Sequence, residues 1–63
     1  MQELDCVELI QPFEGFSIGT KGTVVLTYPG PHAEVEFFNA EHKTIGVFTV
    51  PTNLLKVMWS DAK

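Results

Sequence analysis

The sequence predicts an all-β domain, built as a small SH3-like five-stranded barrel with one short 3₁₀ turn before the last strand. Three observations support this prediction. Apolar residues follow a period of two, β-branched and aromatic residues gather in short runs, and Gly or Pro separates one run from the next. Closing five short strands into a barrel also removes most of the unpaired edges that an open sheet would leave.

The first half of the chain contains two predicted strands and a long loop between them. Residues 4–10 form a short alternating run, which predicts the first strand. Residues 11–19 contain Pro and Gly and therefore predict a loop, but Phe13 and Phe16 indicate that this loop folds back onto the core. Residues 21–28 are rich in Val, Thr and Tyr and give the strongest strand signal.

The middle of the chain predicts a hairpin. Residues 29–32 read Pro-Gly-Pro-His and predict a turn, and residues 33–38 then alternate between apolar and polar side chains as a half-buried strand does. Residues 39–42 have the length of a hairpin connection to an antiparallel strand at 43–50. Gly46 within that strand predicts a bulge or a sharp bend.

The chain ends with a short turn and a short strand. Residues 51–54 begin with Pro and predict one 3₁₀ turn, residues 55–59 predict the closing strand, and residues 60–63 are expected to form a frayed tail. Residues 1–63 are therefore a single domain, since a chain of this size has room for only one small core. An OB-fold is the alternative, although that fold usually needs more residues and a helix.

The composition and net charge of the chain argue against some classes of binding partner. Eight Asp and Glu face four Lys and no Arg, which gives a formal net charge of −4. This balance argues against nucleic acid and against anionic membranes, because both bind through clustered cations, whereas a basic protein partner is compatible with it. We see neither a signal peptide nor an apolar run of membrane-spanning length, and we expect a cytoplasmic protein. A single cysteine, Cys6, excludes an internal disulfide.

Several segments together resemble a known family. They are Leu4-Asp5-Cys6-Val7, Gly22-Thr23-Val24-Val25, Glu34-Val35-Glu36-Phe37, and the stretch from Thr44 through Pro51 that leads to Leu54. With these segments the chain resembles a family of small bacterial, often cyanobacterial, SH3-like domains of unknown function. The resemblance spans nearly the whole chain and supports the fold, but it implies no activity.

The residues do not assemble into a predicted catalytic, metal or cofactor site. His32 and His42 lie at opposite ends of one extended strand, so they are too far apart to share a metal ion. No nucleophile-elbow motif or phosphate-binding glycine loop is present, and the five glycines are expected at turns, bulges or close backbone approaches. The sequence therefore predicts neither an enzyme nor a cofactor.

The remaining candidates are aromatic and acidic side chains. Phe16 and Trp59 are expected to plug the ends of the barrel, because so small a core needs every large side chain. Phe38 shares the face of Glu34 and Glu36, opposite the core-facing positions, and is expected to be exposed. These three residues and Phe13, which lies in the early loop where SH3-like barrels bind peptides, are the candidate protein-binding residues.

The sequence supports several functions unequally. The first is a non-catalytic SH3-like protein-interaction module with an acidic patch around one apolar anchor. The second is a small acidic antitoxin or immunity-type protein that neutralises a basic partner. The third is an RNA-associated domain, because Lys21-Gly22-Thr23-Val24 is similar to the KOW element, but the net charge argues against it. Edge strands also allow homodimerisation by strand pairing.

Overall fold

The computed structural model describes residues 1–59, so the predicted frayed tail at 60–63 lies outside the described residues. The chain is all-β, with five strands and one 3₁₀ turn, and the predicted order of elements is confirmed. Strand bounds differ from the predicted ones by a residue or two at most ends. The elements are β1 (Cys6–Leu9), β2 (Lys21–Thr27), β3 (His32–Phe38), β4 (Thr44–Pro51), η1 (Thr52–Leu54) and β5 (Leu55–Trp59).

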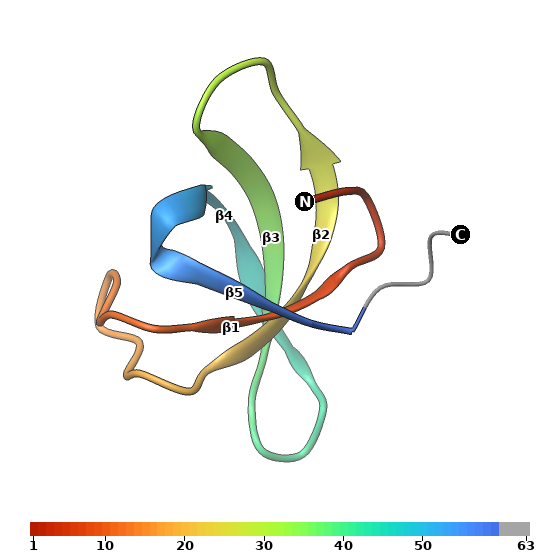
Figure 1. Cartoon of the computed structure of the whole chain (residues 1–63). Helices are drawn as coiled ribbons and strands as arrows, with labels where there is room; N and C mark the ends of the chain where they lie inside the picture. The colour runs from red at the N-terminus through yellow and green to blue at the C-terminus, as the bar shows by residue number, and fades with distance from the viewer. Residues whose placement is uncertain (60–63) are drawn as a thin grey trace.

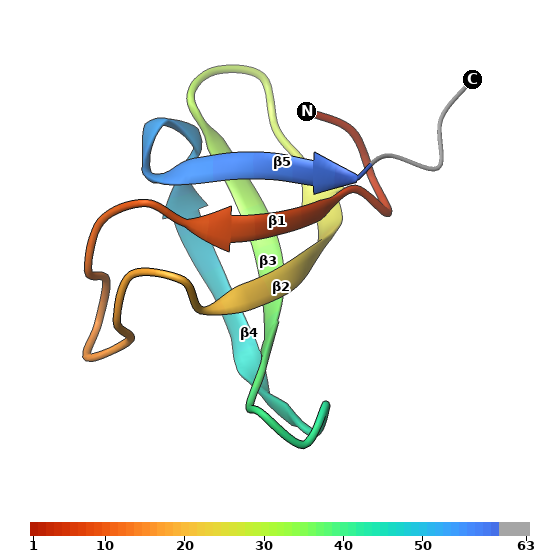
Figure 2. The ribbon, with the colours of Figure 1, turned by 60° about the horizontal axis from the view of Figure 1, so that its bottom comes forward.

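All five strands belong to one antiparallel sheet with the order β4-β3-β2-β1-β5. The sheet is strongly bent: β1 and β5 cross over β3 and β4, and β2 curves from one layer to the other (Figures 1 and 2). Among the described residues, β4 and β5 are the edges of the sheet and are not paired with each other, so a closed barrel is not confirmed.

The core lies between the two layers and receives side chains from every strand. In β3 the alternation predicted from the sequence is observed, because Ala33, Val35 and Phe37 are buried while the residues between them are only half-buried. Burial of these side chains supplies most of the driving force for folding. The buried apolar residues are Val7, Leu9, Val24, Ala33, Val35, Phe37, Val50 and Leu55.

An aromatic cluster closes one end of the core. The ring of Phe16 in the β1–β2 loop lies 5.0 Å from the ring of Phe37 and 5.2 Å from that of Phe48. The Phe13 ring packs edge-on against Phe48, at 6.4 Å. Backbone hydrogen bonds in both directions between Phe13 and Phe16 hold the loop in this shape. The loop therefore folds back onto the core as predicted, and Phe16 takes the plugging position.

Trp59 does not plug the core, so that prediction was wrong. Its side chain is 58% exposed at the end of β5. The register explains the difference: β5 pairs Val57 with Val7 but Trp59 with Cys6, leaving Met58 as an extra residue in a bulge. Paired residues in an antiparallel sheet share a face, and Cys6 lies opposite the buried face of Val7.

A tight turn at the N-terminus is organised by a buried carboxylate. Asp5 is 3% exposed, and its Oδ2 accepts a hydrogen bond of 2.8 Å from the backbone N–H of Gln2. Leu4, with φ at +72°, continues this turn and is not part of β1. Within residues 1–59 no helix has the length and apolar composition needed to cross a bilayer.

Candidate protein-binding surface

The three candidate residues of β3 share its outward face. Glu34, Glu36 and Phe38 alternate with the buried residues of the strand, and each of the three is half-buried. The register places Glu34 opposite Thr49 of β4 and Glu36 opposite Val47. The predicted grouping of these residues on one face therefore agrees with the strand geometry, whereas their binding role stays a prediction.

Hydroxyl groups hold both glutamates in place. Thr49 Oγ1 donates to the two carboxylate oxygens of Glu34, at 2.9 and 3.0 Å, and the Tyr28 hydroxyl donates to Glu34 Oε2 at 2.9 Å. Thr44 Oγ1 donates to Glu36 Oε2 at 2.6 Å. Each carboxylate can accept further hydrogen bonds, so a cation still finds free lone pairs there. We call this set the acidic strip: Glu34 and Glu36 with Tyr28, Thr44 and Thr49.

The Tyr28–Glu34 hydrogen bond raises the pKa of Tyr28 above its ordinary value of 10.0, with smaller contributions from desolvation and from the charge of Glu34. Stability from this bond is present below the unfolded pKa of tyrosine and is lost as pH rises through the folded pKa. Tyr28 is the only tyrosine, so its ultraviolet absorbance reports this titration directly.

We expect Glu34→Ala to lower the midpoint of the Tyr28 titration toward the ordinary value and Glu36→Ala to leave this midpoint unchanged. Equal midpoints in all three proteins would contradict the hydrogen bond.

Apolar side chains border the acidic strip. Val47, opposite Glu36, is 54% exposed, and Leu26, opposite Glu34 on β2, is also exposed. Leu26 reaches this position because a bulge in β2 leaves Val25 unpaired between Val24 and Leu26. The strip therefore combines fixed carboxylates with apolar surface, which is the mixture that protein interfaces use.

Phe38 lies at the end of the strip, and its surroundings differ from those of the glutamates. The register shifts between Phe37 and Phe38: Phe37 pairs with Gly46, whereas Phe38 pairs with Thr44. The residue left over on β4 is Ile45, which forms a bulge beside Gly46. Phe38 also lines a groove between the β1–β2 loop and the β3–β4 hairpin. Its side chain is half-buried there, so it is less exposed than expected, although it is not enclosed in the core.

Phe13, the fourth candidate, is half-buried and packs against Phe48 at the closed end of the core. It lies in the β1–β2 loop, away from the strand that carries the two glutamates. The structure therefore does not bring Phe13 into the acidic strip. A structural role for its ring is evident, and its role in binding stays a prediction.

Sequence reasoning missed the hydroxyl partners of the two glutamates. Thr44 and Thr49 are ordinary strand residues in the sequence, and only the β3–β4 register places them beside Glu36 and Glu34. The predicted hairpin connection at 39–42 could have suggested how β3 and β4 pair. The bulge at Ile45, however, shifts the register between the two strands by one residue.

The histidines lie at opposite ends of β3 as expected, although His32 belongs to the strand and not to the predicted turn at 29–32. His32 begins β3, and His42 lies in the β3–β4 turn with φ at +63°, at the other end of the strand. Across the residues that the structure describes, no three His, Cys, Asp or Glu side chains gather closely enough to hold a metal ion.

Comparison with known proteins identifies a family but no individual relative. Residues 3–57, which cover most of the chain, match the family described as a domain of unknown function (DUF4926). No curated protein and no solved structure matches the chain. The predicted membership of a family of unknown function is thus confirmed at that level, while the bacterial origin and the particular segments stay predictions.

Proposed function

Since the chain belongs to the DUF4926 family, whose function is unknown, we propose a function from its own surface. The protein is a non-catalytic SH3-like interaction module that binds another protein through the acidic strip. The strand order, the long loop after the first strand and the 3₁₀ turn before the last strand all support the SH3-like assignment.

The preorganised carboxylates of the acidic strip carry this proposal. Glu34 and Glu36 are fixed by three hydroxyl donors before any partner arrives, so less side-chain entropy is lost when a cation binds. With a net charge of −4, the chain would attract a basic partner over long range. Exposed Val47 beside Glu36, with Phe38 at the end of the strip, supplies apolar contact area.

The outer edge of β4, which is unpaired among residues 1–59, supports a further contact of the same module. Thr44–Pro51 contains no charged residue, and charged residues are a common protection of exposed edges against pairing. A second copy or a strand of the partner would add there by backbone hydrogen bonds. Homodimerisation by strand pairing is therefore part of the proposal. The molecular mass of the purified chain in solution shows whether the chain is a monomer or a dimer.

We expect a tagged chain to recover one stoichiometric, basic partner from its native host. The double variant Glu34→Gln/Glu36→Gln should recover about tenfold less of this partner, or even less, because removing charged hydrogen bonds at an interface weakens binding strongly. The matched control is Glu3→Gln/Glu14→Gln, which removes the same charge from exposed residues outside the strip. Quantitative mass spectrometry of the three eluates measures the difference.

Three other outcomes of this experiment would decide against this binding mode, and a fourth would change the class of protein that we propose. Equal losses in both double variants would mean that net charge, and not the strip, attracts the partner. Recovery of RNA would favour the KOW-like alternative, and recovery of no partner would leave the acidic strip as solvated surface. A basic partner that is toxic when expressed without this chain would favour the antitoxin or immunity-type alternative over a general interaction module.

A further inference from the structure

A groove of about 570 Å³ lies between the β1–β2 loop and the β3–β4 hairpin. Its apolar lining comes from both sides: Phe16 and Ile18 belong to the loop, and Phe38 and Ile45 belong to the hairpin. Ile18 is 61% exposed and Ile45 47%. Water therefore covers apolar surface here that a ligand side chain could bury favourably.

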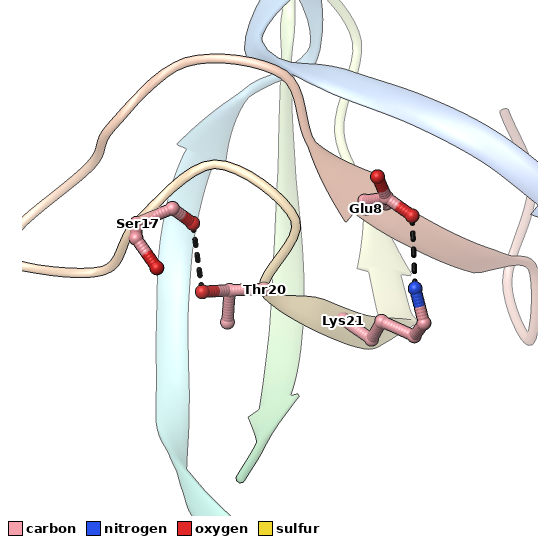
Figure 3. Close-up of polar contacts among 4 residues, drawn as sticks. All are labelled: Glu8, Ser17, Thr20 and Lys21. Carbon is pink, nitrogen blue, oxygen red and sulfur yellow. Dashed lines mark hydrogen bonds and ion pairs between the residues drawn. The ribbon is translucent and has the colours of Figure 1, made fainter. Parts of the chain in front are cut away.

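The charged groups around this groove differ from those on the rest of the acidic chain. Among the residues that the structure describes, none of those lining the groove carries a carboxylate, and Lys21 contributes a cationic side chain to it. Lys21 Nζ lies 2.9 Å from Glu8 Oε1, and the lysine side chain is 69% exposed (Figure 3). An exposed ion pair of this kind is weak in water, so the ammonium group is available to a second carboxylate.

Hydrogen bonds fix both walls of the groove. On the loop side, Thr20 Oγ1 donates to the carbonyl of Ser17 at 2.8 Å (Figure 3). On the hairpin side, Asn39 Oδ1 accepts the backbone N–H of Lys43 at 3.0 Å, and the His42 N–H donates to the Asn39 carbonyl at 2.9 Å. The groove is therefore formed in the free chain, which reduces the entropy that binding costs.

We propose that this groove binds a short acidic segment of a partner protein, in which an apolar side chain lies beside a carboxylate. The apolar side chain would pack between Ile18 and Phe38, and the carboxylate would approach Lys21. This site extends the proposed interaction module and shares its premise that the chain binds proteins. It requires neither glutamate of the acidic strip, and its ligand has the opposite charge.

A peptide titration tests the proposal on the isotopically labelled, full-length chain by amide NMR. The probe is the acetylated and amidated peptide Glu-Phe-Leu-Asp-Glu. The controls are Lys-Phe-Leu-Lys-Lys, which reverses its charge, and Glu-Gly-Gly-Asp-Glu, which lacks its apolar side chains. We expect the probe alone to displace the amide signals of Ile18, Ala40 and Ile45, with a dissociation constant of about 1 mM, as is reasonable for so short a ligand.

Variants with exposed substitutions locate the site. Ile18→Ser should weaken probe binding about tenfold and Lys21→Gln about threefold. Their controls on β5 are Met58→Ser, which also replaces an exposed apolar residue, and Lys56→Gln, which also removes an exposed lysine. Both controls should bind the probe normally.

Four results would overturn the proposal: no displacement by the probe, equal binding of the basic peptide, signals displaced mainly along the acidic strip, or unchanged binding by Ile18→Ser. Displacement of the same signals by concentrating the chain alone would also overturn it, because a second copy would then be the occupant. The double variant Glu34→Gln/Glu36→Gln should bind the probe normally, so failure of the strip and failure of the groove are distinguishable.

Discussion

We expect the Phe37→Ala variant to be largely unfolded at room temperature. Phe37 is fully buried, and its ring contacts two other aromatic rings, with centroids 5.0 Å from Phe16 and 6.0 Å from Phe48. Truncating a buried Phe to Ala costs about 3–5 kcal/mol. A single hydrophobic core in a domain below about 70–80 residues rarely supplies more than about 3–5 kcal/mol of stability. The substitution therefore removes most of the stability.

The experiment compares urea unfolding of the wild type, Phe37→Ala and Phe37→Leu by far-ultraviolet circular dichroism. Fluorescence of Trp59 is a poor reporter because that side chain is already 58% exposed in the folded chain. Phe37→Leu retains an apolar side chain and should stay folded, with a loss of about 1–1.5 kcal/mol. If Phe37→Ala unfolds at the same urea concentration as the wild type, Phe37 is not central to the core.

The parts of the fold that could be predicted are those fixed by local pattern. The alternation of residues 33–38 identified β3 and its buried face, because side chains along a strand point to opposite sides. Pro51 correctly placed the 3₁₀ turn, since proline both ends a strand and fixes the backbone for a turn. Phe16 was predicted to contact the core because two phenylalanines in a Gly-rich loop have no other apolar surface to cover.

The parts that could not be predicted depend on long-range register. Bulges leave Val25, Ile45 and Met58 unpaired, and each one changes which side chains meet across the neighbouring strands. The bulge at Met58 explains why Trp59 is exposed, and the one at Ile45 places Phe38 opposite Thr44. A period-two pattern read along one strand contains no information about such insertions in its partner.

The candidate site shows the same division. Glu34, Glu36 and Phe38 could be assigned to one face from the sequence, because that assignment needs only alternation within β3. The groove needs two segments far apart in the chain to lie together, the loop that carries Ile18 and the hairpin that carries Ile45. A pattern within one segment does not show that two distant segments lie together, so the groove could be identified only from the structure.

Among the five glycines, Gly22 has the least free space around it, because β2 and β3 approach each other closely there. It pairs with Val7 of β1 and with Phe37 of β3, and it is buried. A Cβ atom at this position would lie 2.7 Å from Val35 Cγ1, 2.8 Å from the Glu36 carbonyl oxygen and 3.0 Å from Phe37 Cδ1. The φ angle of Gly22 is not positive, so the glycine is required for close approach rather than for backbone conformation.

We therefore expect Gly22→Ala to lower the free energy of unfolding by about 3 kcal/mol, at the upper end of the usual cost of overpacking. The Glu36 carbonyl belongs to the backbone of a central strand, so it cannot move aside without disturbing its pairing with the neighbouring strands. Gly30→Ala is the matched control, because Gly30 has φ at +98° but open space around its Cα. Gly30→Ala should cost only about 1 kcal/mol, from backbone strain.

Urea unfolding of the Gly22→Ala and Gly30→Ala variants measures the difference between their free energies of unfolding. A smaller effect at Gly22 than at Gly30 would show that β2 and β3 do not approach each other this closely, and the position of Phe37 beneath Gly22 would then be wrong as well.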